Sequence, residues 1–390
     1  MTEKLYYQDA YISEFVATVL LCEKTCDGYR ILLDRTAFFP EEGGQSADTG
    51  HIGEASVLDV FEESGLVYHL TDKPLDVGES VDCRLDFDTR FEKMQLHTAE
   101  HIVCGIIHSL YGYENVGFHL GDEIVTFDIS APMTREMLDR VEDMANRAVF
   151  RNLPIYTSFP SAAELSKISY RSKLDITEGV RIVTIEGVDA CACCAPHVAR
   201  TGEIGVIKLL DFEKHRGGCR IYLTAGVRAR ADYRRRYELT KAVSGYLSKP
   251  QMIIDLGVAE LISERDALRR EIALAEISRV KMLAATEEAV KDCKLFVIPD
   301  AQTEALREFC NEMSLKSDGY IAAISKNGDA YRYVLCKRDS DISDFVKKAN
   351  AALCGKGGGR GCMATGNFSA CLSDIESYFK MLSIKGFENA

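Results

Sequence analysis

Two short motifs that lie far apart in the chain constrain its fold most strongly, because their side chains suit one metal ion. In the stretch HTAEH, His97 and His101 are four residues apart. On a helix, residues with this spacing project from one face, about one turn apart. In the stretch CCAPH, Cys193 precedes His197 by the same spacing. If both pairs bind one ion, the fold must bring these two segments together.

Three imidazoles and one thiolate suit Zn²⁺, which prefers nitrogen and sulfur ligands in tetrahedral geometry. Taken alone, His97 and His101 are equally compatible with core or surface positions on an amphipathic helix. The downstream Cys193 and His197 favour the metal, and the sequence predicts one Zn²⁺ per chain. Of the three cysteines between 191 and 197, only Cys193 stands four residues before His197.

Composition and charge exclude several classes of protein. A chain of 390 residues exceeds what one hydrophobic core usually supports, so we expect two or three domains. We find neither a signal-peptide pattern nor an apolar run long enough to cross a bilayer. Fourteen cysteines without an export signal indicate a reducing, cytoplasmic setting with free or metal-bound thiols. The net charge of -13 argues against sequence-blind nucleic-acid binding, while a local basic surface stays open.

Hydrophobic periodicity predicts an α+β protein in four parts. Residues 1–89 alternate short β-prone runs with turns, which indicates a small β-barrel carrying a Gly-rich motif. From Arg90 the period becomes helical until Gly112, within a zinc-binding α/β domain over 90–226. Residues 227–292 read as a helical arm, and residues 293–390 alternate strands and helices as a further α/β domain.

Two glycine-rich stretches are candidate binding loops. In FFPEEGGQSADTG, Gly43 and Gly44 allow close approach of backbone to a ligand, although by themselves they favour a tight turn between two strands. The stretch GKGGGRG lacks the spacing of a P-loop. Its glycines, with Lys356 and Arg360, suit either a phosphate backbone or a flexible linker.

Four stretches occur in the order found in one known family. FFPEEGGQSADTG, LHTAEHI, VGFHLGDEIVTFDI and CCAPHVARTGEIG resemble the editing domain of alanyl-tRNA synthetases and its free-standing relatives, the AlaX proteins, over residues 10–226. The tail, with GKGGGRGCMATGNFSA, resembles the DHH-associated domain that ends the longer members. No segment resembling a synthetase catalytic domain precedes them, so we expect no aminoacylation.

The resemblance implies hydrolysis of the ester in tRNA(Ala) mischarged with serine or, more weakly, with glycine. It implies the same four zinc ligands that the spacing predicts. Carried over to this chain, it implies that Gln45 lines the amino-acid pocket or contacts the 3′-terminal adenosine, and that Gly43 and Gly44 allow close approach. We expect Asp48 to contact the substrate as well, and Gln45 and Glu100 to take catalytic roles. It also implies a tRNA-binding DHH-associated domain and a homodimer through the helical arm or that domain.

This chain departs from the family pattern at two places. CCAPH replaces the common C-G-G-T-H, which removes the flexibility and the threonine hydroxyl of that loop. Glu100 stands where the synthetases often have threonine. A carboxylate there suits a general base, a partner for the substrate's α-ammonium group, or an orienting partner of a ligand histidine. Four protein ligands also leave open whether the zinc is catalytic or organises the pocket.

Basic residues at the start of the arm are the candidate tRNA contacts. Arg234 and Arg235 lie there, and Lys356 and Arg360 form a second group in the tail. A run of this kind also suits the solvated face of a helix. Three other functions stay open: a zinc-stabilised tRNA-binding module without catalysis, a deacylase of a different aminoacyl-tRNA, and a thiol-based redox protein using Cys191, Cys193 and Cys194.

Overall fold

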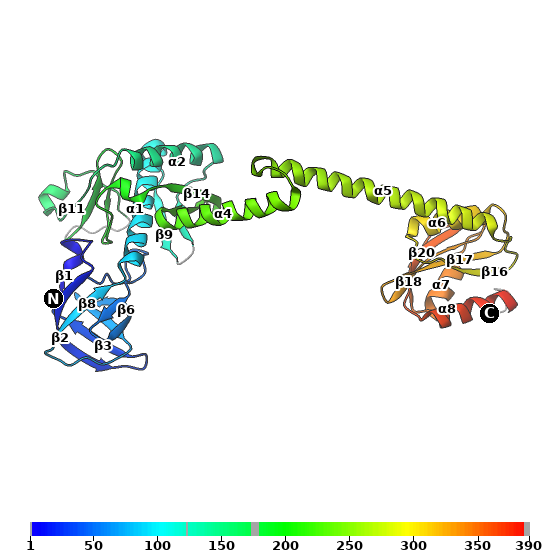
Figure 1. Ribbon diagram of the computed structural model, residues 1–390, viewed down its shortest axis with the longest axis horizontal. Helices are drawn as coiled ribbons and strands as arrows, with labels where there is room; N and C mark the ends of the chain where they lie inside the picture. The colour runs from blue at the N-terminus through cyan, green and yellow to red at the C-terminus, as the bar shows by residue number, and fades with distance from the viewer. Residues whose placement is uncertain (1, 122–123, 173–178, 386–390) are drawn as a thin grey trace. The chain divides into compact units, whose positions relative to one another are not determined.

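The computed structural model describes residues 2–121, 124–172 and 179–385, and it has the mixed α/β character that the sequence predicts (Figure 1). The chain divides into two compact units, Met1–Thr240 and Lys241–Ala390, which we describe separately. Within the described residues, no helix combines the length and apolar character that crossing a membrane requires. The finer division into four domains stays a prediction.

Six strands near the N-terminus close into a barrel in the order β2-β3-β7-β6-β5-β8. They are β2 (Glu14–Lys24), β3 (Tyr29–Leu33), β5 (Gly50–Ile52), β6 (Ala55–Glu63), β7 (Leu66–Thr71) and β8 (Ser80–Leu85). Burial alternates along β8, where Val81, Cys83 and Leu85 face the barrel core. Beside the barrel, β1 (Glu3–Lys4) pairs with β4 (Arg35–Thr36), and the 3-10 turn η1 (Leu5–Tyr7) follows β1.

The helix α1 (Phe87–Tyr111) is the central element of the first unit. Asp86 caps its start, because its side chain accepts a hydrogen bond from the Thr89 amide, and Gly112 ends it at a φ of 68°. Every residue from 93 to 107 is buried. The middle of this helix is therefore enclosed on all sides, and it holds His97 and His101 in the interior.

Two further sheets and a helix surround α1. The stretch VGFHLGDEIVTFDI contains most of β9 (Asn115–Leu120) and all of β10 (Val125–Ile129), which join β14 (Ile207–His215) and β15 (Gly218–Ala225) in the order β14-β15-β10-β9. A second sheet contains β11 (Ile155–Ser158), β12 (Ile182–Ile185) and β13 (Asp189–Ala192). The other helices of this region are α2 (Arg135–Phe150) and α3 (Ala162–Leu165), and a 3-10 turn, η2, spans Thr201–Ile204.

Close packing of α1 on β13 depends on one glycine. A Cβ atom at Gly105 would lie 2.6 Å from the Cβ atom of Asp189 and 2.6 Å from the carbonyl oxygen of Val188. Only glycine leaves room for this approach. The contact brings the end of β13, and the cysteine-rich loop that follows it, beside the two histidines of α1.

The predicted arm consists of α4 (Gly226–Leu247), the 3-10 turn η3 (Gln251–Ile253) and α5 (Ile254–Thr286). The second unit contains one five-stranded sheet in the order β16-β17-β18-β20-β19. Its strands are β16 (Cys293–Val297), β17 (Tyr320–Asn327), β18 (Ala330–Cys336), β19 (Gly355–Gly358) and β20 (Met363–Phe368).

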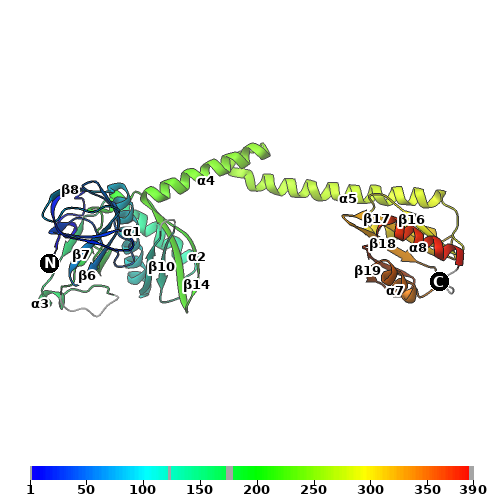
Figure 2. The same cartoon turned by 90° about the horizontal axis from the view of Figure 1, so that it is seen from below.

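Helices cover both faces of this sheet (Figure 2). One face of β17, with Ile321 and Ala323, packs against α6 (Thr303–Ser314) and the C-terminal part of α5. The other face, with Ala322 and Ile324, packs against α7 (Ser343–Ala352) and α8 (Leu372–Lys385).

The stretch GKGGGRG is neither a linker nor an open loop. Residues 355–358 form β19, which pairs antiparallel with β20. A Cβ atom at Gly357 would lie 2.4 Å from the Cα atom of Gly366, and one at Gly366 would lie 2.6 Å from the Tyr333 ring. These glycines therefore allow β19 and β20 to pack closely against the buried ring of Tyr333. The stretch is not the flexible linker that the sequence allowed.

Candidate metal centre and active-site cavity

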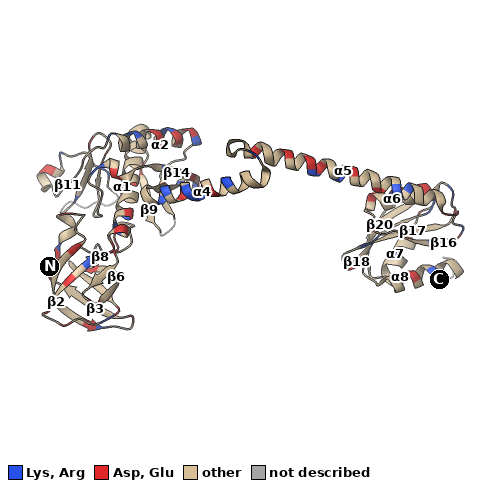
Figure 3. Ribbon diagram, in the orientation of Figure 1, with Lys and Arg blue, Asp and Glu red and all other residues tan. Residues whose placement is uncertain are grey.

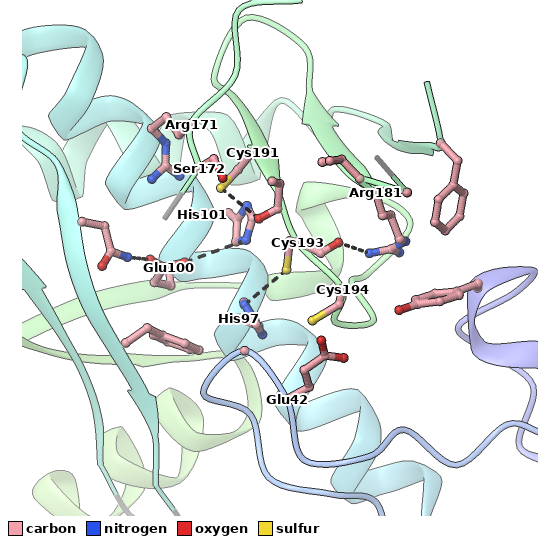
Figure 4. A pocket seen from close by; sticks show the side chains of 18 of the residues that line it. Glu42, His97, Glu100, His101, Arg171, Ser172, Arg181, Cys191, Cys193 and Cys194 are labelled. Atoms are coloured by element: carbon pink, nitrogen blue, oxygen red, sulfur yellow. Dashed lines mark hydrogen bonds and ion pairs between the residues drawn. The ribbon is translucent and has the colours of Figure 1, made fainter. Parts of the chain in front are cut away.

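The structure brings the four predicted metal ligands together, and Figure 4 shows three of them, His97, His101 and Cys193. His97 and His101 come from α1, and Cys193 and His197 come from the loop after β13. The Cys193 Sγ atom lies 3.3 Å from His197 Nε2 and 3.6 Å from His97 Nε2. One ligand atom from each residue lies within 4.8 Å of the others. Three imidazoles and a thiolate gathered in this way fit a tetrahedral zinc site.

Hydrogen bonds orient the two histidines of α1 toward this cluster. His97 Nδ1 lies 3.0 Å from Gln45 Oε1, and His101 Nδ1 lies 3.2 Å from Asp189 Oδ2. Both oxygens only accept hydrogen bonds, so each Nδ1 donates and each Nε2 is the nitrogen left for a metal. Asp189 is itself held by Arg171, whose Nε and Nη2 atoms donate at 2.8 Å.

The third histidine is oriented by a hydroxyl. Thr98 Oγ1 donates to the Met94 carbonyl at 2.7 Å and lies 3.0 Å from His197 Nδ1. Because the Thr98 proton is already used, its oxygen accepts from His197 Nδ1–H. All three ligand histidines therefore present Nε2 to the side of Cys193, an arrangement that raises ligand basicity in metal sites.

The protonation states suit metal binding. Burial would raise the pKa of Cys193, but the three surrounding histidines hold it well below its usual range. Burial lowers the pKa of His197 to about 3, so this imidazole is neutral. Burial would lower the pKa of His101 as well, but Cys191, Asp189 and Cys193 raise it. A thiolate with imidazoles is the form that binds Zn²⁺, and binding at His101 displaces a proton.

The other two cysteines of the cluster lie outside this set. Cys191 joins His101 and Asp189 in a second, overlapping group, and burial raises its pKa. Burial also raises the pKa of the Cys194 thiol. Cys194 Sγ lies beside Gly43, 3.3 Å from where a Cβ atom would stand. Both thiols are therefore protonated near neutral pH, unlike Cys193.

A cavity of about 480 Å³ opens onto three of the four predicted metal ligands. Its wall includes His97, His101 and Cys193, together with Glu100. The Glu100 carboxylate is 3% exposed and accepts a hydrogen bond from Asn115 Nδ2 through Oε1. Its Oε2 atom lies 4.0 Å from His101 Nε2. A buried carboxylate thus faces the cavity next to the predicted metal position.

The glycine-rich motif contributes in two different ways. Gly43, at a φ of 62°, lines the cavity. Gly44 packs instead against β9, where an added Cβ atom would lie 2.5 Å from the Phe118 carbonyl oxygen. Gln45 is fully buried and reaches the site through His97, and its Nε2 atom has no hydrogen-bond partner within the described part of the chain. Gly44 and Gln45 therefore shape and orient the site without lining the cavity.

Asp48 does not lie at the cavity, contrary to the expected substrate contact. Its carboxylate is buried against Arg90, whose Nε atom lies 3.0 Å from both oxygens. Asp48 Oδ2 also accepts a hydrogen bond from the Phe39 amide at 2.7 Å. The ion pair joins the glycine-rich motif to the first turns of α1, so the role of Asp48 in this structure is to position the motif.

We expect Asp48→Ala to lower the free energy of unfolding by about 3–5 kcal/mol, because the guanidinium of Arg90 would stay buried without its partner. Urea unfolding measures this effect. Glu14→Ala is the control, since Glu14 makes an exposed ion pair with Arg84 at 3.6 Å and such pairs contribute little. Equal urea midpoints of unfolding for Asp48→Ala and Glu14→Ala would contradict the structural role of Asp48.

Sequence reasoning missed Thr98, Asp189, Asn115 and Arg171. Thr98 lies inside HTAEH, and Asp189 lies just before the cysteine cluster. Their places next to the metal motifs could have identified both residues, because polar residues near ligand histidines commonly orient them. Asn115 and Arg171 lie in other segments, and nothing in the sequence connects them to the metal motif.

The predicted basic contacts all lie at the surface. Arg234 and Arg235 are exposed on α4, where Figure 3 shows several basic positions along the helix. Lys356 and Arg360 are exposed on and after β19 in the second unit. Arg228 is already engaged, since its Nε atom donates to Glu92 at 2.6 Å.

Comparison with known proteins gives family matches over the glycine-rich motif and over the metal loop. The family described as "Threonyl and Alanyl tRNA synthetase second additional domain" matches residues 180–222, which include Cys193 and His197. The family "tRNA synthetases class II (A)" matches residues 3–89. The C-Ala domain of Aquifex aeolicus alanyl-tRNA synthetase covers 24% of this chain and 90% of that domain, with 19% identity and a TM-score of 0.21.

Curated relatives match over most of the chain. The Alanyl-tRNA editing protein AlaX-L of Pyrococcus horikoshii is 28% identical, and the alignment covers 96% of each protein. The Alanyl-tRNA editing protein Aarsd1-B of Xenopus laevis is 27% identical over 90% of each. The alanine–tRNA ligase of Ignicoccus hospitalis is 29% identical over 93% of this chain, but over only 41% of the ligase. The converging metal motifs and these matches along nearly the whole length support the assignment of this chain to the AlaX family of alanyl-tRNA editing proteins.

Proposed function

We propose that this protein is a zinc-dependent aminoacyl-tRNA deacylase that acts in trans. It hydrolyses seryl-tRNA(Ala), and more weakly glycyl-tRNA(Ala), to free tRNA and amino acid. The observation that carries the proposal is the convergence of His97, His101, Cys193 and His197 at a cavity that Glu100 also lines. The names of the full-length relatives, alanyl-tRNA editing proteins, support the substrate class.

The chemistry divides between the metal and the side chains around it. Zn²⁺ bound by the four ligands would supply positive charge that polarises an ester carbonyl or orders the substrate end. Glu100 is the proposed general base, because Oε1 is engaged by Asn115 while Oε2 faces the metal ligands. Gln45 positions His97, and Gly43 allows close approach of the acyl group along the cavity wall.

Discrimination between serine and alanine is the test of this function. Alanine fits wherever serine fits, so exclusion by size cannot protect correctly charged tRNA. The pocket must leave polar groups unpaired when the hydroxyl is missing, and such sites discriminate on the order of 10⁴-fold. We expect kcat/KM for seryl-tRNA(Ala) to exceed that for alanyl-tRNA(Ala) by this order, with glycyl-tRNA(Ala) hydrolysed more slowly than the seryl form. Comparable rates on the seryl and alanyl forms would defeat the proposal.

The exposed Lys356 and Arg360 are proposed to contact tRNA phosphates, as are Arg234 and Arg235 on α4. We expect Lys356→Ala with Arg360→Ala to weaken tRNA binding and to reduce the slope of log K against log salt by about one to two units, since each lost phosphate contact reduces it by roughly one. Binding titrations at several salt concentrations measure the slope. The control is Lys24→Ala, which changes an exposed residue of the barrel. Equal slopes for the wild type, the double variant and this control would contradict the phosphate contact.

A homodimer through the arm is a further part of the proposal. The helix α5 exposes Leu261, Leu268 and Ile272, which are 56%, 51% and 60% exposed. Apolar side chains along one exposed helix support association with a second copy of the chain. A cytoplasmic location stays a prediction from cysteine content.

A further inference from the structure

The cavity wall includes an aromatic pair that the proposed chemistry does not use. Tyr7 and Phe159 both line the cavity, and their ring centroids lie 5.4 Å apart with the rings inclined at 70°. Phe159 is 55% exposed. Aromatic rings left open to a concave site offer flat apolar faces that bind planar groups.

Two buried aromatic rings support the Tyr7 ring. The Tyr7 ring packs edge-to-face on the Tyr6 ring, with the ring centroids 4.7 Å apart. The Tyr6 ring packs in the same way on Phe39, with the centroids 5.4 Å apart. Tyr6 is 2% exposed and Phe39 is fully buried. Because these supporting rings are enclosed in the core, Tyr7 presents a preorganised face to the cavity.

Arg181 lies between Tyr7 and the metal loop, and Figure 4 shows its hydrogen bond to Cys193. Its guanidinium lies 5.4 Å from the centroid of the Tyr7 ring. The same side chain donates through Nη1 to the Cys193 carbonyl at 2.9 Å and to the Ala195 carbonyl at 2.8 Å. One fixed residue therefore contacts both the aromatic face and the backbone of a metal ligand, which sets the distance between them.

The charges around the pair favour a neutral ring over a phosphate group. Lys4 lies 5.5 Å from the Tyr7 centroid, but its Nζ atom is engaged by Glu62 at 2.7 Å. Arg181 is buried and bound to the two loop carbonyls. Glu42 lines the same cavity and adds negative charge. The Lys4 ammonium and the Arg181 Nη1 donor are therefore already engaged beside the aromatic pair, while Arg181 Nε keeps no hydrogen-bond partner within the described residues.

We propose that Tyr7 and Phe159 form a stacking platform for the 3′-terminal base of the aminoacylated RNA. The platform rests on the proposed deacylase function, because the base is the group attached, through its ribose, to the scissile ester. A cavity of about 480 Å³ is in the range that holds complete small ligands, beyond a seryl group alone. Stacking on aromatic side chains is the usual way in which proteins hold an unpaired base. It places the ester at the metal centre while the base lies against the platform.

The test uses adenosine that carries serine through a 3′-amide, which the protein cannot hydrolyse as an ester, with serinamide as the probe without a base. Isothermal titration calorimetry measures both affinities on the zinc-loaded protein. We expect Phe159→Ala and Tyr7→Leu to bind the adenosine probe roughly ten- to a hundred-fold more weakly and to bind serinamide as the wild type does. Phe159→Tyr should keep the wild-type affinity, because it keeps the ring.

The control is Phe150→Ala, which removes an aromatic side chain that is 77% exposed and does not line the cavity. Phe159→Ala decides the question if Tyr7→Leu fails to fold, since Phe159 is largely exposed. Wild-type affinity of Phe159→Ala for the adenosine probe would overturn the platform while seryl-tRNA hydrolysis continued. A wild-type protein that neither hydrolyses seryl-tRNA(Ala) nor binds the probe would overturn the deacylase function, and the platform with it.

Discussion

Cys193→Ala is expected to lose stoichiometric zinc and seryl-tRNA hydrolysis together. Cys193 Sγ lies among the Nε2 atoms of three histidines, and those histidines hold its pKa well below the usual thiol value. Removing this thiolate leaves three neutral donors and a weakly held ion. Elemental analysis of the purified protein measures zinc, and release of labelled serine measures hydrolysis. His97→Ala and His101→Ala should give the same paired loss, because helix and loop share one ion.

Two neighbouring cysteines provide matched controls. Cys191→Ala and Cys194→Ala should keep both zinc and activity, because burial raises the pKa of each thiol and neither belongs to the four-ligand set. A Cys191→Ala protein without zinc, beside a Cys193→Ala protein with zinc, would show that the overlapping group of His101, Asp189 and Cys191 is the occupied site. Full zinc content in all of these variants would contradict the proposed metal centre.

Glu100→Gln is expected to lower kcat by about 10²- to 10⁴-fold, the usual contribution of a positioned general base. Glutamine keeps the hydrogen bond that Asn115 donates to Oε1, so the pocket should keep its shape and its zinc. Steady-state hydrolysis of seryl-tRNA(Ala) measures the effect. A rise in KM with unchanged kcat would instead assign Glu100 to binding of the substrate's α-ammonium group.

Glu114→Gln is the control for this change. Glu114 lines the same cavity, but its side chain is 54% exposed and pairs with His108 at 3.0 Å. We expect its kcat to stay close to that of the wild type. Equal losses in Glu100→Gln and Glu114→Gln would indicate a general effect of cavity charge, without a specific role for Glu100.

The sequence by itself predicted many of the elements and the four residues that the structure brings together as candidate metal ligands. Period-two alternation in 80–85 gives β8, and the helical period with a stop at Gly112 gives α1. The four-residue spacing that selected Cys193 and His197 is also local, since it depends on the path of one short loop. Such features are readable because burial and backbone geometry repeat along the chain within a few residues.

Only the tertiary structure decided the partners of those residues. Asp48 stood beside the glycines as an apparent ligand contact, yet its carboxylate is bound to Arg90. Gln45 and Asp189 each orient a histidine on α1 although they come from distant segments. Which segments meet depends on strand order, on register and on the close approach that a glycine such as Gly105 allows. No local period in the sequence encodes those contacts, because the two residues of each contact are far apart along the chain. They meet only when the core packs.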